Sequence, residues 1–218
     1  MEMLYNISVW ILPLMLAIIL HEIAHGWAAL YFGDPTAKKA GRLTLNPIKH
    51  IDRTGTIILP ALLVLLKSPV VFGYARPVPV DFSSLNPLRL GTICVALAGP
   101  ATNFLLAVIA GFLLPHQQNE WIIDNITNML VINCVLMLFN LIPLPPLDGG
   151  RVVAAIFTRT PQIWFAKYDR AGMAIFFMLL LLPGFFGFNL ASKILETPVL
   201  WTVTQILLLT GNDLAMLK

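Results

Sequence analysis

Residues 7–35 read ISVWILPLMLAIILHEIAHGWAALYFGDP, an apolar run that carries an ionisable cluster in its second half. Its apolar part, residues 7–32, exceeds the roughly 20 residues that a helix needs to span a bilayer. The cluster consists of His21, Glu22 and His25. Because ionisable side chains are costly at membrane depth, their presence there indicates a functional site. The closing Gly-Asp-Pro ends the predicted helix.

The composition is that of an integral membrane protein. Of 218 residues, 58% are hydrophobic and only 11% are charged, which excludes a large soluble catalytic or ligand-binding module. We expect a single membrane domain over residues 1–218, an all-α bundle of about five to six transmembrane helices. The net charge of +3 gives no support for nucleic acid binding. The two cysteines, Cys94 and Cys134, cannot build a disulfide framework.

Two more long apolar runs complete the predicted core of the bundle, at about residues 90–114 and 121–142. A C-terminal helical hairpin is expected over about residues 171–209, with Lys193 and Glu196 in its short connection. Lysine and arginine gather after the first long apolar run and again after the third. By the positive-inside rule, both of these segments face the cytoplasm and the N-terminus lies outside.

Two pieces between the first and second long runs do not suit a full crossing. The apolar run at residues 56–66 contains Pro60 and is too short to span, which favours a re-entrant or interfacial segment. The sequence FGYARPVPVDF at residues 72–82 has prolines whose preceding residues favour extended backbone. We expect it to form an extended or strand-like element near the cytoplasmic face.

The sequence HEIAH at residues 21–25 is the most specific chemical signal in the chain. On a helix, residues four apart lie on one face, so His21 and His25 can bind one tetrahedral metal, with Glu22 beside it as the base. Random residue order would give about 0.001 such matches in this composition. The alternative is a buried polar cluster that only holds helices together.

A catalytic zinc site usually has three protein ligands and one open position, so a third ligand is needed. His50, His116 and Asp148 are the candidates by chemistry. Asp148 is favoured because it lies in a proline- and glycine-rich break at membrane depth, where an unpaired carboxylate is costly. Its alternative role is the N-cap of the next helix. The later glutamates, Glu120 and Glu196, are expected in short loops on the opposite side, which disfavours them.

At three places the chain resembles the site-2 proteases, which are intramembrane zinc metalloproteases. HEIAH at residues 21–25 matches their first motif, and FNLIPLPPLDGG at residues 139–150 matches their Asn, Pro and Leu-Asp-Gly motif. LAGPATN at residues 97–103 is similar to their glycine motif. The pieces LNPIKHID at 45–52 and FGYARPVPV at 72–80 look like the short prokaryotic branch, which lacks PDZ and CBS domains.

This resemblance implies that His21, His25 and Asp148 bind one Zn²⁺ per chain and that Glu22 is the general acid and base. It also implies that Asn140 holds the substrate backbone or the oxyanion, with an ordinary helix-to-helix hydrogen bond as the alternative. Asn103 is expected to be a packing residue. The implied activity is regulated intramembrane proteolysis of transmembrane-helix substrates by a multi-pass protein of the cell membrane, with its active site toward the cytoplasm.

Ten helical residues separate Ile23 from Gly33, so the metal would lie about 15 Å below the cytoplasmic helix end. A substrate helix must unwind before it can be cut, and residues 41–52 or 73–81 are expected to capture the freed backbone by strand addition.

A metalloprotease of another HExxH class is an alternative that needs a downstream glutamate ligand. A zinc-binding transporter or an inactive scaffold is the non-enzyme alternative. The sequence indicates neither the substrate nor the oligomeric state.

Overall fold

Among the residues that the computed structural model describes, three helices are long and apolar enough to cross a membrane. They are α1 (Glu2–Tyr31), α4 (Leu88–Leu113), which continues as a 3₁₀ turn to His116, and α5 (Glu120–Asn140). These are the three long helices that the apolar runs predict, with α1 beginning earlier, at Glu2. The chain is therefore an all-α protein with the helices of a membrane protein.

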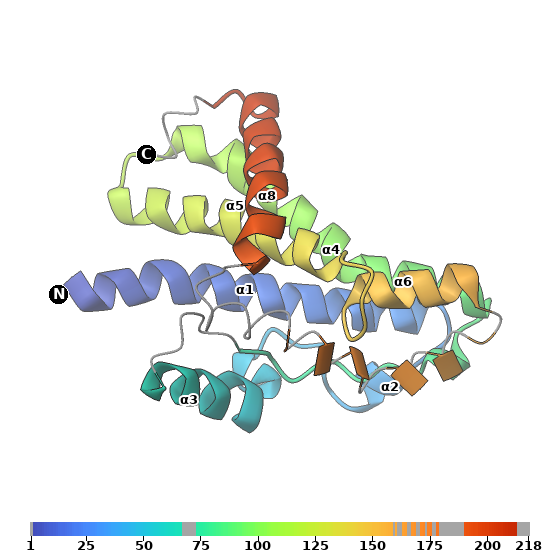
Figure 1. Ribbon diagram of the computed structural model, residues 1–218. Coiled ribbons are helices and arrows are strands. Elements are labelled where there is room, and N and C mark those ends of the chain that lie inside the picture. The colour runs from blue at the N-terminus through green and yellow to red at the C-terminus, as the bar shows by residue number, and fades with distance from the viewer. Residues whose placement is uncertain are drawn as a thin grey trace.

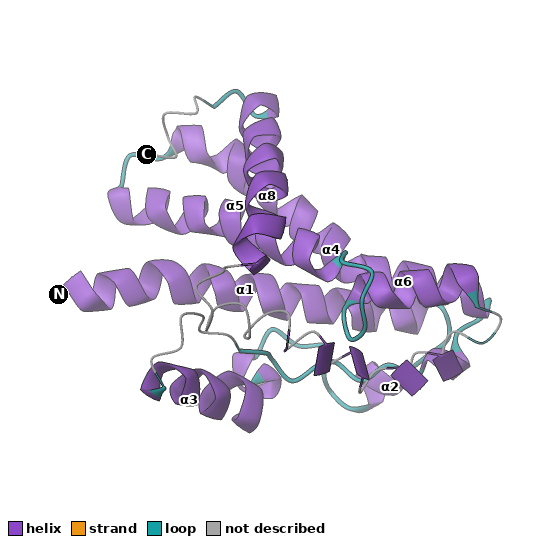
Figure 2. Ribbon diagram, viewed as in Figure 1, coloured by secondary structure: helices purple, strands orange, loops and turns teal. Residues whose placement is uncertain are grey.

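The structure describes residues 2–66, 73–158, 160, 163–164, 167–168, 171–172, 174–175, 178 and 190–212. Within these ranges the other α-helices are α2 (Thr36–Lys39), α3 (Leu59–Leu65), α6 (Asp148–Phe157) and α8 (Leu190–Leu209). Short 3₁₀ or π turns cover η1 (Pro47–His50), η2 (Arg53–Ile58), η3 (Phe82–Ser84) and η4 (Leu114–His116). No strand occurs in the described ranges, as Figure 2 shows.

Helix α1 lies in the middle of the fold (Figure 1). Helices α4, α5 and α8 lie on one side of it, and α2, α3 and residues 73–81 lie on the other. Helix α6 packs against α4. Helices α1, α4 and α5 pack against one another in all three pairs. An apolar core between α4, α5 and α8 includes the fully buried Leu130 and Leu207. His21 of α1 is buried, and Glu22 and His25 are half-buried.

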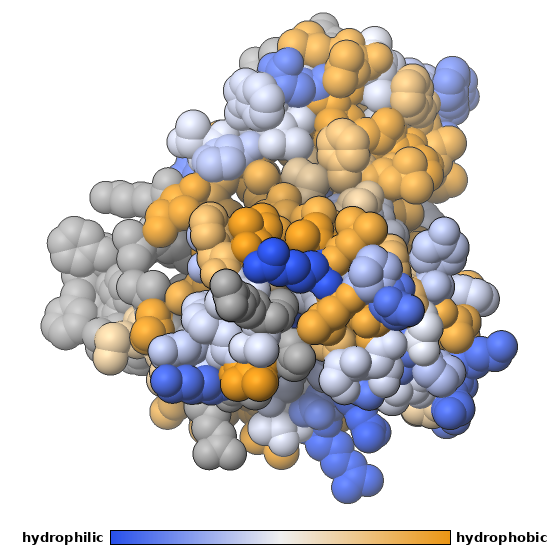
Figure 3. Space-filling model, turned by 90° about the vertical axis from the view of Figure 1, so that its right-hand side faces the viewer, coloured by the Kyte–Doolittle hydropathy of each residue, from blue (hydrophilic) through white to orange (hydrophobic). Residues whose placement is uncertain are grey.

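Large apolar side chains remain exposed on the outside of the long helices. Trp10 on α1 is 54% exposed, and Phe104 on α4 is 46% exposed. Hydrophobic residues also cover much of the upper half of the face drawn in Figure 3. Extended apolar surface of this kind suits a lipid environment better than water.

Helix α8 corrects the predicted C-terminal hairpin. It runs without a break from Leu190 to Leu209 and includes Lys193 and Glu196, which were expected in a connecting loop. Pro198 lies inside the helix, where the missing N–H removes only one backbone hydrogen bond. Most of the first arm of that hairpin, residues 171–189, lies outside the described residues.

The chain between α5 and α6 is irregular over residues 141–147, as the prolines of this segment predict. Helix α6 begins directly afterwards, at Asp148. A β-carbon on Gly149 would collide with the carbonyl oxygens of Leu141 and Ile142. The glycine therefore lets the first turn of α6 lie directly against the preceding backbone, which fixes the position of Asp148.

Residues 73–81 form a non-helical segment beside α1. Every second N–H group of the segment donates to a neighbouring part of the protein. The Tyr74 N–H donates to the Gly55 carbonyl oxygen at 3.1 Å, and the Arg76 N–H donates to the His50 carbonyl oxygen at 2.9 Å. The Val78 N–H donates to Glu22 of α1. The segment is thus extended, as predicted, but it forms no ladder with a second strand among the described residues. Phe72, the first residue of the predicted element, lies outside these residues.

Candidate metal centre

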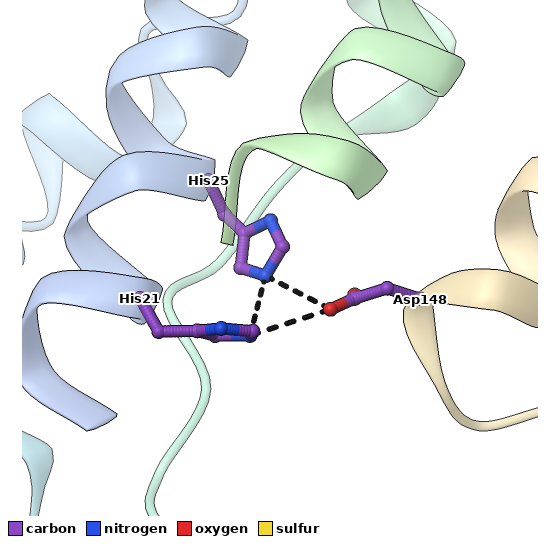
Figure 4. Close-up of side chains that lie close together, drawn as sticks. All are labelled: His21, His25 and Asp148. Carbon is purple, nitrogen blue, oxygen red and sulfur yellow. Dashed lines mark hydrogen bonds and ion pairs between the residues drawn. The ribbon is translucent and has the colours of Figure 1, made fainter. Parts of the chain in front are cut away.

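Two imidazoles of α1 and one carboxylate of α6 converge on a single point (Figure 4). His21 and His25 lie one helical turn apart, and their Nε2 atoms are 3.0 Å from each other. Asp148 Oδ2 lies 3.3 Å from each of these nitrogens. All three side chains are largely buried, with 9%, 12% and 13% of the surface exposed for His21, His25 and Asp148.

The outer ring nitrogens fix the tautomer of both histidines. His25 Nδ1 lies 2.7 Å from the Val95 carbonyl oxygen, which can only accept, so Nδ1 carries the proton. His21 Nδ1 lies 2.5 Å from Asn103 Oδ1 and donates to it in the same way. In the neutral form of each imidazole, Nε2 therefore directs a lone pair toward Asp148.

This donor set fits a zinc ion. Asp148 Oδ2 is a buried carboxylate oxygen that accepts no hydrogen bond, and an uncompensated buried charge of this kind is costly. A tetrahedral site with zinc bonds of about 2.0 Å places neighbouring ligand atoms about 3.3 Å apart. The observed separations of 3.0 and 3.3 Å are close to that value. A cation held by the three residues would satisfy all three lone pairs.

Helix α4 closes one wall of the site at Gly99. A β-carbon there would lie 2.5 Å from His25 Nε2 and 2.6 Å from His21 Nε2. The absence of a side chain is therefore a requirement for the two imidazoles to converge. The LAGPATN motif thus lies directly against the candidate metal-ligand group, which consists of His21, His25 and Asp148.

We expect Gly99→Ala to lower the zinc affinity by at least tenfold, because the methyl group would push the two Nε2 atoms apart. Equilibrium competition with a zinc chelator measures this. Gly111→Ala is the matched control, since it lies on the same helix and its methyl group would also be crowded, at 2.9 Å from Ile206 and Thr210. Equal affinities in the two variants would contradict the prediction.

Glu22 lies outside the three-residue group and faces the extended segment. Its Oε2 accepts a hydrogen bond of 2.7 Å from the Val78 N–H. Val78 stands between Pro77 and Pro79, neither of which has an N–H, so it provides the one backbone donor of this tripeptide. The glutamate that sequence analysis expects as the base is thus held by a rigid stretch of backbone.

One arginine, Arg42, adds positive charge near Glu22. The buried Arg42 donates through Nη2 to the Arg76 carbonyl oxygen at 2.7 Å. Burial and the neighbouring Arg76 charge lower the pKa of Arg42, while the Glu22 carboxylate raises it. Arg42 remains charged at neutral pH, because its pKa starts so high, and it counters the carboxylate charge.

The structure shows which of the candidates for the third metal ligand lies beside His21 and His25. Asp148 joins the two α1 histidines, and among the described residues no other histidine, cysteine or carboxylate does so. His50 is buried elsewhere, with Nε2 at 2.9 Å from the Thr44 carbonyl oxygen, and His116 lies in η4. The N-cap residue of α6 is Leu147 and Asp148 is the first residue of the helix, so the alternative role of Asp148 as an N-cap is wrong.

The remaining predicted residues lie outside this group. Asn140, at the end of α5, donates to the Leu136 carbonyl of its own helix at 2.9 Å. Glu120 is the first residue of α5, and Glu196 lies within α8 instead of in a loop.

The roles of two asparagines were not predicted from the sequence. Asn103 was assigned to packing, but it bonds His21, and Asn133 was not singled out. The only sequence signal is an amide in the middle of an otherwise apolar helix, which packing explains equally well.

Comparison with known proteins agrees with this geometry. The sequence profile of peptidase family M50 matches residues 9–128 and 115–183. The chain is 38% identical over 183 residues to the Bacillus subtilis protein named "Putative zinc metalloprotease YwhC", a match that covers 79% of this chain and 80% of that protein. It is 28% identical over 174 residues to "Putative zinc metalloprotease Rip2" of Mycolicibacterium smegmatis, covering 78% of this chain and 65% of that protein. No solved structure matches the chain. The chain therefore belongs to peptidase family M50, the site-2 protease family of zinc metalloproteases.

Proposed function

We propose that this protein is an intramembrane zinc endopeptidase that cuts transmembrane segments of other membrane proteins. The observation that carries the proposal is the position of the two candidate histidine ligands, His21 and His25, on α1. His21 precedes the end of this membrane-length helix by ten residues, which corresponds to about 15 Å. A protease that acts on soluble or surface-exposed peptides has no need of a metal site at that depth.

The proposed topology places the N-terminus outside and the site toward the cytoplasm. The proposed bundle has five to six membrane elements. These are the three long spans, a re-entrant element and the C-terminal part of the chain. The run from Arg53 to Leu65 is apolar but shorter than a full crossing, which supports the re-entrant role. The basic residues of segment 34–53 support the cytoplasmic assignment.

His21, His25 and Asp148 would hold the zinc ion through two neutral nitrogens and one carboxylate oxygen. When bound, zinc would act as a Lewis acid that lowers the pKa of a water molecule and polarises the scissile carbonyl. The Nδ1 hydrogen bonds to Asn103 and Val95 keep both imidazoles in the tautomer that this role requires.

Glu22 would move the protons of the reaction. It would take a proton from the attacking water and later pass it to the nitrogen of the leaving amine. The Val78 N–H bond holds Oε2 at 2.7 Å, so we place the proton transfer at Oε1.

The substrate backbone would lie along residues 73–81. Tyr74, Arg76 and Val78 already use their N–H groups on the protein side. The opposite edge presents the backbone of Ala75, Pro77 and Pro79, which offers carbonyl acceptors and a single N–H. An unwound substrate would therefore bind there by donating its own N–H groups, and Asn140 would contact it farther along. Residues 41–52 suit this role less, because η1 interrupts them.

The test uses purified protein in lipid vesicles with two versions of one substrate sequence. One version is a transmembrane helix, and the other is the same sequence held in a water-soluble fusion. We expect zinc-dependent cleavage of the first, with mass spectrometry locating the cut inside the apolar segment. Cleavage confined to the flanking polar residues, or equal cleavage of the soluble version, would refute the intramembrane role.

A further inference from the structure

Two buried asparagine side chains connect α5 and α4 to His21 on α1. Asn103 of α4 and Asn133 of α5 are both 0% exposed. Asn103 Oδ1 lies 2.5 Å from His21 Nδ1, and Asn103 Nδ2 donates to Asn133 Oδ1 at 2.7 Å. Asn133 Nδ2 in turn donates to the Met129 carbonyl oxygen at 2.8 Å. These contacts form one continuous chain of hydrogen bonds across three helices.

The Met129 carbonyl oxygen sets the direction of the whole chain, because a carbonyl can only accept. Asn133 must therefore present its NH₂ group to Met129 and its oxygen to Asn103. Asn103 must then present its NH₂ group to Asn133 and its oxygen to His21. An oxygen at that place requires the proton of His21 on Nδ1. Each amide has one orientation that satisfies both neighbours, and reversing it would place like groups in contact in a buried site.

We infer that Asn133 is a positioning residue for the metal centre, which it reaches through Asn103 without contacting the metal or its ligands. The pair sets which nitrogen of His21 is available for coordination and holds the ring plane in place. This inference rests on the proposed zinc site. It gives the amide pair a chemical role beyond holding helices together, because an apolar pair of the same size would pack but would not orient the imidazole.

The chain offers a matched control for simple helix packing. Asn128 lies on the same helix as Asn133 and donates through Nδ2 to the Val9 carbonyl oxygen of α1 at 2.8 Å. This bond also joins two membrane-length helices through an asparagine amide, but it does not lead to His21. Replacement of each asparagine by leucine, which is similar in size and apolar, separates positioning from packing.

The first measurement is zinc affinity by chelator competition in detergent. We expect Asn103→Leu to weaken zinc binding about 10- to 100-fold, the range for outer-shell partners of ligands, and Asn133→Leu to weaken it about tenfold. Asn128→Leu should stay within about twofold of the wild type. The double variant Asn103→Leu/Asn133→Leu should bind zinc no more weakly than Asn103→Leu alone, because Asn133 acts through Asn103.

The second measurement is ¹⁵N NMR of labelled histidine in the metal-free protein, at a pH at which the imidazoles are neutral. We expect His21 to be protonated on Nδ1 in the wild type and in Asn128→Leu, and to show both tautomers in Asn133→Leu. An unchanged tautomer in Asn133→Leu, or equal zinc affinities in Asn133→Leu and Asn128→Leu, would overturn the inference. Because the NMR readout needs no metal, it tests the role of Asn103 and Asn133 independently of the proposed zinc site. Absence of zinc from the wild type would instead overturn the proposed function.

Discussion

Glu22→Gln is expected to lower the rate of peptide-bond cleavage by about 10²- to 10⁴-fold, the usual contribution of a general acid or base. Glutamine keeps the shape of glutamate, and its carbonyl oxygen can still accept the Val78 N–H bond. It cannot take a proton from water at neutral pH. Zinc content should stay at the wild-type value, because Glu22 lies outside the ligand group. Single-turnover cleavage of a transmembrane substrate in vesicles, with zinc measured on the same samples, checks both parts.

The matched control for this variant is Glu120→Gln. Glu120 is the first residue of α5, and it makes no part of the metal-ligand group. Its substitution should change neither cleavage nor zinc content. If Glu22→Gln kept more than a tenth of the activity, Glu22 would not be the base. Loss of zinc from Glu22→Gln would instead show that Glu22 supports the metal centre itself.

Asp148→Ala is expected to weaken zinc binding by more than about 100-fold, beyond the usual effect of an outer-shell partner. The substitution removes one of three ligands, and the two imidazoles that remain carry no charge to balance the dication. Cleavage should fall with the metal content. Chelator competition followed by metal analysis of the purified protein gives the affinity and the stoichiometry.

Asp124→Ala is the control for the loss of a carboxylate from a membrane-length helix. Asp124 of α5 accepts a hydrogen bond of 2.7 Å from the Tyr5 hydroxyl of α1 and lies apart from the metal-ligand group. We expect it to keep the wild-type zinc affinity. Equal affinities in Asp148→Ala and Asp124→Ala would show that the third ligand is a different residue.

The long helices could be predicted because their signal is local. A run of apolar residues of membrane length forms a helix whatever its neighbours are, so α1, α4 and α5 agree with the expected ranges. The continuity of α8 through Pro198 was missed. A proline removes one backbone hydrogen bond, and only the packing of the surrounding helix decides whether the helix continues.

The candidate site also has a part that could be predicted from the sequence and a part that could not. Spacing alone brings His21 and His25 to one face of α1, and the break before α6 singled out Asp148, which the structure places beside them. The contacts that orient these groups were not predictable. The Val78 N–H on Glu22 and the Asn103 oxygen on His21 join residues 56 and 82 positions apart. Contacts between residues so far apart produce no periodic pattern in the sequence, so they can be identified only in the packed fold.

The hydrogen-bonded chain from Met129 to His21 also bears on the order of events during biogenesis. It exists only when α1, α4 and α5 are in one register, since a slide of one helical turn, about 5.4 Å, would separate the two amides. Asp148 then has to arrive with α6. Helices that have entered the bilayer but have not yet packed therefore lack a formed metal centre. If the proposed function holds, zinc loading is a late step, and a half-assembled chain would have no protease activity inside the membrane that is still receiving it.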